Sequence, residues 1–417
     1  MSDTTARVDG PAVDGPAPDI GDVAKNFYVF DPALADNPYP TLHRLVNECP
    51  VAHSEMFGGY WIISKHAEIL RVLSNPETFS AQIPIIPRLH GDDMINTIPS
   101  ALDPPELTAY RNMLAPMFSP SVVRASEPRL RAHARALSQK FASAEGPFEF
   151  VAEFGIPLPS QALLEMFDLP AEDLERLLHY KDVMITDQLH PDPEVRRKFV
   201  EVEFPAIKAY WEEKIAQRRD ESWTGTDMLT NLVRARLPGE RVLTKDELIR
   251  VITTLVGAGL DTTTAQLCMA MIYFAENPDR WAELIEHPDR VPGAVEEMLR
   301  VNTNVCTSRL VMKDTELGGV SIAAGEMVLL LNPASSFDGD AFASPDDVDF
   351  RRQPNRHLAF SGGAHLCLGA TMARAQIRVA LEELSRAVPR FRLVPGTRPR
   401  RTFGILAEIQ ELRLEHF

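Results

Sequence analysis

The sequence predicts a mainly α-helical protein with a few small β-sheets. Apolar residues recur at intervals of three and four over most of residues 104–300, which is the spacing of amphipathic helices. Shorter apolar runs bounded by turn residues occur before and after this region and are typical of strands. The composition, 45% hydrophobic and 24% charged over 417 residues, is that of a globular chain that needs no disulfide framework.

Taken in order, residues 1–24 are predicted to be a disordered tail, because VDGPA occurs twice in tandem and Pro, Gly and Asp dominate. Helical spacing begins at Asn37, and residues 58–63 indicate a turn followed by a strand. Helices are expected over residues 104–117, 121–143, 158–168, 171–187, 193–219, 245–277, 279–286 and 292–300, with a shorter one around 229–233. A strand at 326–331, a helix from 369 to about 388 and strands over 393–417 complete one domain of residues 25–417, without an internal linker.

Charge and hydropathy exclude several classes of function. The net charge of −16 opposes binding to a nucleic-acid backbone. The first residues contain no apolar leader, and the apolar stretch at residues 251–260 ends at Asp261, too short to cross a membrane. We therefore expect a cytoplasmic protein that binds neither nucleic acid nor membrane.

Positive charge is concentrated near the carboxyl end. Against only two acidic residues, Glu382 and Glu383, residues 351–390 hold Arg351, Arg352, Arg356, Arg374, Arg378, Arg386 and Arg390. Such an excess indicates either scattered surface charge or a basic face for an acidic partner.

One ten-residue segment, FSGGAHLCLG at residues 360–369, has a composition suited to holding a reactive thiolate. Two glycines allow a tight turn, and Cys367 follows immediately before a predicted helix, whose N-terminus favours a thiolate. Gly369 lets a flat, bulky group approach the backbone, Phe360 can shield one side, and His365 can donate a hydrogen bond. A lone cysteine is usually a small buried hydrophobe, but this frame favours a ligand.

The segment resembles the heme-binding loop of the cytochrome P-450 superfamily, FxxGxHxCxG, at every fixed position. Glu297 and Arg300 match the ExxR motif of that family, 70 residues before the cysteine, and residues 258–263 (AGLDTT) resemble its oxygen-groove motif. Within the superfamily the chain is similar to the bacterial camphor 5-monooxygenase group, with DPPE at 103–106 and VDF at 348–350. The resemblance covers residues 30 to 417 and implies the cytochrome P-450 fold, with heme b (iron protoporphyrin IX) between the long central helix and the cysteine loop.

The resemblance also implies roles for individual residues. A cysteinate ligand favours O–O cleavage at the iron, so Cys367 is the expected metal ligand, with Phe360, His365 and Gly369 around the heme. Ala258 and Gly259 would open the central helix for oxygen, and Asp261 and Thr262 would form an acid–alcohol pair that relays protons to dioxygen.

Further polar residues are assigned to structural and cofactor contacts. Glu297 and Arg300 are expected to form a buried network with Arg352 that holds the cysteine loop. Arg111 and Arg309 are expected at the heme propionates, together with His365. The sequence departs from the family at Leu107, where many relatives carry a His or Gln that reaches a propionate.

The substrate side of the pocket follows from the register of the resemblance and is almost entirely apolar. The expected substrate contacts are Ile85, Met94, Ile95, Thr254, Gly257, Val305, Ile405 and Leu406. No tyrosine stands where the camphor-type relative hydrogen-bonds its ketone, so camphor itself is not expected. A small-to-medium hydrophobic substrate follows, a terpenoid or another cyclic apolar molecule.

These features together imply a monooxygenase that inserts one atom of O2 into such a substrate, with electrons from a ferredoxin and its ferredoxin reductase. No fused reductase is expected, because the chain ends at Phe417. Two alternatives stay open: a peroxide-driven heme-thiolate enzyme, and a non-catalytic heme sensor. Asp261 and Thr262 favour the monooxygenase, because peroxide-driven relatives usually lose this pair and a sensor does not need it.

Overall fold

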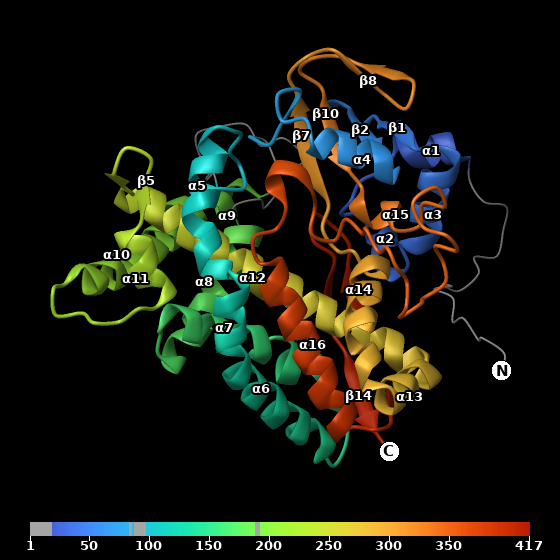
Figure 1. Cartoon of the computed structure of the whole chain (residues 1–417). Coiled ribbons are helices and arrows are strands. Elements are labelled where there is room, and N and C mark those ends of the chain that lie inside the picture. The colour runs from blue at the N-terminus through green and yellow to red at the C-terminus, as the bar shows by residue number, and fades with distance from the viewer. Residues whose placement is uncertain (1–18, 83–85, 87–96, 188–191) are drawn as a thin grey trace.

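The computed structural model describes residues 19–82, 86, 97–187 and 192–417. The expected substrate contacts Ile85, Met94 and Ile95 lie outside the described residues. Figure 1 shows a large helical region and a smaller region in which the first helices lie with most of the strands.

The helices follow the predicted amphipathic segments closely. They are α1 (Ile20–Lys25), α2 (Pro32–Asp36), α3 (Tyr39–Glu48), α4 (His66–Leu73), α5 (Glu106–Leu114), α6 (Pro120–Ala142), α7 (Pro157–Phe167), α8 (Leu174–Thr186), α9 (Pro193–Lys198), α10 (Phe204–Arg219), α11 (Met228–Arg234), α12 (Lys245–Glu276), α13 (Pro278–Glu286), α14 (Val291–Val301), α15 (Asn332–Ser335) and α16 (Ala370–Ala387). The helix predicted over residues 193–219 is divided into α9 and α10 by a π-helical turn at Phe199–Glu203.

The strands form small sheets. The described strands are β1 (Val51–Ser54), β2 (Tyr60–Ile63), β3 (Phe79–Ser80), β4 (Phe148–Glu149), β5 (Arg236–Leu237), β6 (Arg241–Val242), β7 (Thr307–Val311), β8 (Thr315–Leu317), β9 (Val320–Ile322), β10 (Met327–Leu330), β11 (Phe391–Leu393), β12 (Arg400–Thr402), β13 (Glu408–Glu411) and β14 (Arg413–His416). The largest sheet has the order β1-β2-β10-β7-β3, with β10 parallel to β2 and antiparallel to β7. Val328 of β10 pairs with Arg309 of β7, and this register sets the position of Arg309 along its strand.

The predicted boundary of the N-terminal tail is corrected by α1. Asp19 caps this helix by accepting a hydrogen bond from the Gly21 N–H, and Ala24 is buried. The Lys25 carbonyl accepts a hydrogen bond from the Glu55 N–H, which ties α1 to the chain after β1. Residues 20–24 are therefore helical, because their apolar side chains find a packing surface that periodicity alone could not reveal.

Helix α12 is the central element of the helical region. Its start is set by a capping box, in which the Thr244 side chain accepts from the Glu247 N–H and the Glu247 side chain accepts from the Thr244 N–H. The N-terminal half packs in one hydrophobic cluster and the C-terminal half in another, so α12 joins two parts of the core. Its length and apolar composition would suffice to cross a membrane, but 61% of its most apolar window is buried inside the fold, as in a core helix.

Candidate active site

A cavity of about 270 Å³ lies between α12 and the segment that leads into α16. Ala258, Gly259 and Thr262 of α12 line one side. Phe360 and Cys367 line the opposite side, so two segments about 100 residues apart in sequence enclose one space. Apolar residues from α7, α11 and α12 line more of the wall: Leu163, Met166, Phe167, Met228 and Leu255.

The loop before α16 presents the Cys367 thiol to this cavity. The Cys367 N–H donates to the Phe360 carbonyl at 2.9 Å, which closes the loop on itself. Gly363 has a φ of +59°, and a Cβ there would lie 2.0 Å from the Leu73 carbonyl oxygen, so the loop seats against α4 only because this residue is glycine. Cys367 is exposed on the cavity side. The protein around the rest of this side chain desolvates the thiol and so raises its pKa, whereas the N–H of Gly369 and the charge of Arg111 act in the opposite direction.

A cluster of donors and cations lies beside this loop. Arg309 on β7 is buried, and within the described residues no carboxylate lies within ion-pair distance of it. Burial lowers the pKa of Arg309 to about 10 and the pKa of His365 to about 4, the second helped by the positive charge of Arg309. His365 Nε2 and Thr307 Oγ1 are buried and have no hydrogen-bond partner in the described part of the chain. Such groups call for an anion, since buried donors and charges are costly when unpaired.

Known proteins resemble this chain over most of its length. The family model of cytochrome P450 matches residues 164–405. Nocardicin C N-oxygenase of Nocardia uniformis subsp. tsuyamanensis is 31% identical over 92% of this chain and 97% of its own length. Steroid C26-monooxygenase of Mycolicibacterium smegmatis is 31% identical over 79% of this chain and 78% of its own. The crystal structure of cytochrome P450 CYP101C1 superposes with a TM-score of 0.83 and 28% identity, covering 94% of this chain and 97% of that one.

The chain belongs to the cytochrome P450 superfamily. The predicted family, fold and enzyme class are confirmed: this P450 is a monooxygenase-class oxidoreductase that binds heme b. The residues of this cavity fit that group. Cys367 would supply the sulfur ligand, and at Gly369 even an added Cβ would lie 3.9 Å from that sulfur. The buried charge of Arg309 and the unpartnered His365 Nε2 and Thr307 Oγ1 would suit the carboxylate edge of a heme.

Arg111, which is also predicted at the heme propionates, contacts the cysteine loop. Its guanidinium donates to the Leu366 carbonyl at 2.5 Å, directly beside Cys367. Arg111 therefore supports the P450 cysteine loop from α5. Leu107 is buried in the same helix and offers no donor. Thr307 was missed by the sequence analysis, although its place two residues before Arg309 in a strand puts both side chains on one face.

Asp261 and Thr262, which are predicted to form an acid–alcohol pair, have different surroundings on α12. The Thr262 hydroxyl lines the cavity and donates back to the Ala258 carbonyl at 2.7 Å, a bond that bends helices. A Cβ at Gly259 would meet nothing within 4 Å, so the cavity reaches the helix backbone there. Asp261 points elsewhere and forms an ion pair with Lys181 of α8, with Nζ 2.6 Å from Oδ1.

The pair of Asp261 and Lys181 is nearly buried. Burial raises the pKa of Asp261, while the charge of Lys181 acts against this rise. Asp261 Oδ2 is buried without a hydrogen-bond partner within the described chain. Lys181 also reaches Asp182, whose side chain is mostly exposed, so charged groups lead from the surface to the middle of α12. No pattern in the sequence singles out Lys181.

The structure brings Glu297, Arg300 and Arg352 into one network. The Arg300 side chain is completely buried and donates to both Glu297 oxygens at 2.7 and 2.8 Å. Arg352 Nε lies 3.1 Å from Glu297 Oε1. Asn355 joins as a fourth member that the sequence analysis did not name, donating to Glu297 at 2.9 Å. The network fixes the irregular stretch between β10 and the cysteine loop.

Only some of the predicted substrate contacts line the cavity. Val305 lines the P450 cavity, whereas Thr254, Gly257, Ile405 and Leu406 are not among its lining residues. The Thr254 hydroxyl donates to the Arg250 carbonyl inside α12, and Leu406 forms a bridge with Val305. Polar side chains that the apolar prediction omitted also line the cavity: Thr263, Gln266, Asn304 and Asn332.

Much of the predicted basic face is neutralised. Arg374 pairs with Glu296 at 2.7 Å and lies over the Phe360 ring at 4.5 Å. Arg378 pairs with Glu127 and Glu382, and Arg386 pairs with Glu383. The count over residues 351–390 included Glu382 and Glu383 but not Glu127 and Glu296, which come from α6 and α14.

Proposed function

We propose that this P450 is a cytoplasmic monooxygenase that hydroxylates a cyclic, terpenoid-like hydrophobic substrate with electrons from a ferredoxin. Support comes from the juxtaposition of Cys367 and Thr262 across one largely apolar cavity. When bound, heme supplies the activation of dioxygen that a P450 requires. The residues of this chain have to hold the heme, exclude water and deliver protons.

Cofactor retention is assigned to two groups of residues. Cys367 would hold the iron, and the Arg309, His365 and Thr307 cluster would hold the carboxylate edge. A carboxylate beside Arg309 would balance the buried charge of its guanidinium, which donates to the neutral Ser308 carbonyl. Arg111 and the glycine-dependent turn at Gly363 keep the cysteine loop in place.

Proton delivery is assigned to Asp261 and Thr262. Burial raises the pKa of Asp261 and its Oδ2 has no partner within the described residues, so this carboxyl group is suited to take up and release a proton. The Thr262 hydroxyl stands on the cavity side of the same turn and can hold a proton donor at the reaction centre. The pair supports O2-driven rather than peroxide-driven chemistry.

The substrate class is tested by a panel of cyclic monoterpenes, linear fatty acids and steroids, scored by the change in the heme Soret band. Two relatives are named for lipid and steroid oxidation, the methyl-branched lipid omega-hydroxylase of Mycobacterium tuberculosis and the steroid C26-monooxygenase. We expect the largest shift from the monoterpenes, because the wall formed by α7, α11 and α12 is mostly apolar. A larger shift with fatty acids or steroids would reject the terpenoid assignment.

Thr262→Ala should consume reductant at nearly the normal rate but yield roughly tenfold less product, with the electrons recovered as hydrogen peroxide. The reason is that a positioned proton donor contributes about 10²–10⁴-fold to a reaction of this kind. The measurement is product and peroxide formed per reductant consumed. Thr262→Ser, which keeps the hydroxyl, is the matched control and should stay coupled. Normal coupling in Thr262→Ala would contradict the role of Thr262.

The ferredoxin is assigned to the face near the cysteine loop, where Leu366 is half exposed and Arg356 is exposed without an ion-pair partner in the described residues. Arg356→Glu should slow reduction by an acidic ferredoxin about tenfold at low salt and leave substrate affinity unchanged. Stopped-flow reduction at low and high salt measures this. Arg219→Glu, at the exposed end of α10, is the control and should have no effect. Equal rates for both variants would remove Arg356 from the docking face.

A further inference from the structure

Three buried amide side chains connect α12 with the segment that follows α14. Gln266 lies one helical turn after Thr262, and Asn302 and Asn304 follow the end of α14. All three are at least nine-tenths buried, although side chains of this type are mostly exposed in proteins. Gln266 and Asn304 also line the cavity that holds Thr262.

Two of these amides, those of Gln266 and Asn304, form a chain of hydrogen bonds that ends on the backbone of Thr262. Gln266 Nε2 donates to the Asn302 carbonyl at 2.6 Å and to Asn304 Oδ1 at 3.0 Å. Asn304 Nδ2 donates to the Thr262 carbonyl at 3.3 Å. The residue assigned to proton delivery is thereby tied to a second element through its backbone.

The orientation of each amide is fixed by its partners. Gln266 Nε2 faces a backbone carbonyl, which can only accept, so the amide cannot be turned around. Asn304 must then present its oxygen to Gln266 and its nitrogen to Thr262. Gln266 Oε1 is left buried without a partner in the described part of the chain. The amide thus keeps two bonds to the segment 302–304 at the cost of one unsatisfied oxygen.

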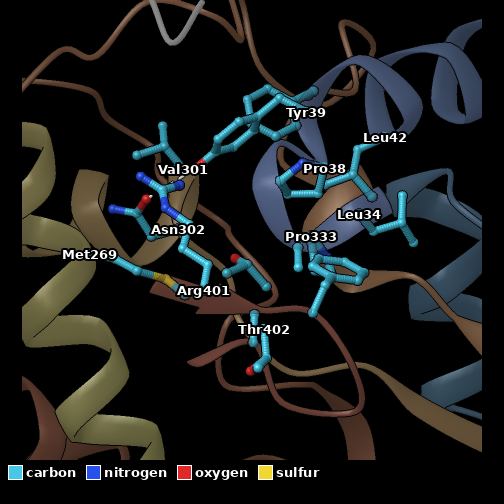
Figure 2. Close-up of a pocket in the computed structure, with 15 residues that line it drawn as sticks. Leu34, Pro38, Tyr39, Leu42, Met269, Val301, Asn302, Pro333, Arg401 and Thr402 are labelled. Atoms are coloured by element: carbon cyan, nitrogen blue, oxygen red, sulfur yellow. Dashed lines mark hydrogen bonds between the residues drawn. The ribbon is translucent and has the colours of Figure 1, made fainter. Parts of the chain in front are cut away.

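The segment 302–304 is itself held from its other side. Figure 2 shows a small pocket in which Tyr39 of α3 lies close to Asn302. The Tyr39 hydroxyl donates to Asn302 Oδ1 at 3.3 Å, and the Asn304 carbonyl accepts from the Ala407 N–H at 2.7 Å. The chain of amides therefore connects Thr262 to a segment that is anchored on α3 and on the backbone near β13.

The turn of α12 from Ala258 to Thr262 carries extra donors at both ends. The Ala258 carbonyl accepts from the Thr262 hydroxyl, and the Thr262 carbonyl accepts from Asn304. A donor that competes for a helix carbonyl bends the helix, so the Asn304 bond bears on the shape of the turn that borders the cavity.

We propose that Gln266 and Asn304 form an amide bridge that positions the Thr262 turn of α12 for proton delivery. They are positioning residues, because they act through the backbone of Thr262. The proposal rests on the function proposed above for Thr262 and adds residues on which the coupling of electron use to product formation depends.

The test uses the heme-loaded enzyme with Asn304→Leu and Gln266→Met, both close in size to the original side chains. With the panel compound that gives the largest Soret shift, we expect the peroxide share of consumed reductant to rise about fivefold in each variant, since small misplacements of a catalytic group have large kinetic effects. Unchanged peroxide shares in both would overturn the proposal.

Thr264→Val is the matched control. The Thr264 hydroxyl donates to the Gly155 carbonyl at 2.9 Å, so this variant also removes one buried hydrogen bond of α12, but on a side chain that does not line the cavity. It should lose as much thermal stability as Asn304→Leu while it stays coupled. Uncoupling by Thr264→Val of the same size would show that any loosening of α12 has this effect, and would reject a specific bridge.

Two further measurements separate this proposal from the role of Thr262. The double variant Thr262→Ala/Asn304→Leu should be no less coupled than Thr262→Ala alone, because Asn304 acts through Thr262; additive losses would overturn the bridge. If Thr262→Ala stays coupled, the proposed proton role fails, whereas uncoupling by Thr262→Ala with normal coupling in Asn304→Leu rejects the bridge alone.

The second measurement is hydrogen exchange without any substrate. Exchange at the backbone N–H of Gln266 should accelerate about tenfold in Asn304→Leu, and an unchanged rate would count against positioning.

Discussion

Cys367→Ser is expected to abolish the absorption signature that reduced, thiolate-ligated heme shows with carbon monoxide, and with it all monooxygenase turnover. Of the four cysteines, Cys367 alone is among the residues that line the cavity. Burial raises the pKa of Cys306 to about 12 and raises the pKa of Cys268 further, so both stay neutral thiols in the apolar core. Neither can replace the lost ligand.

The control for this experiment is Cys49→Ser. Cys49 is only partly buried and contributes to no described part of the cavity wall, so its loss should leave the signature and the turnover intact. Cys367→His should also lose the signature, although imidazole can bind iron, because the spectrum depends on sulfur ligation. A preserved signature in either Cys367 variant would overturn the assignment of the iron ligand.

Glu297→Gln is expected to reduce the free energy of unfolding by about 3–5 kcal/mol, the range found when one member of a buried ion pair is removed. Arg300 would keep its charge with no exposure to water, and its remaining partners would be the carbonyls of Ser336, Pro345 and Asp347. Arg352 would lose the same carboxylate. Because this network fixes the stretch before the cysteine loop, heme retention should fall together with stability.

Urea unfolding of the heme-loaded protein measures this loss. Glu194→Gln is the matched control, since the pair of Glu194 and Arg197 is largely exposed and such pairs contribute about 0–1 kcal/mol. A loss below about 1 kcal/mol in Glu297→Gln would show that the network has no special structural role. The comparison also separates loss of a buried partner from loss of any carboxylate.

Sequence periodicity predicted the helices well because most are amphipathic and pack one face on the core. It failed at the N-terminus, where Ile20–Lys25 is helical although the flanking repeat indicates disorder. Here the helix depends on capping by Asp19 and on contact with the chain after β1. The sequence does contain an excess of arginines near Cys367. However, the acidic partners of Arg374 and Arg378 include Glu296 of α14 and Glu127 of α6, which lie far away in the sequence.

The amino-acid sequence was sufficient to predict those candidate functional residues that belong to short local motifs. The loop at 360–369, the Glu297 and Arg300 spacing and the polar pair in α12 each lie within ten residues, so their geometry follows from short-range rules. The tertiary structure alone decided which distant groups meet: Lys181 with Asp261, Tyr39 with Asn302, and Asn304 with Thr262. These pairs join residues 42 to 263 positions apart, and such partners are selected by how the helices pack, which no local pattern encodes.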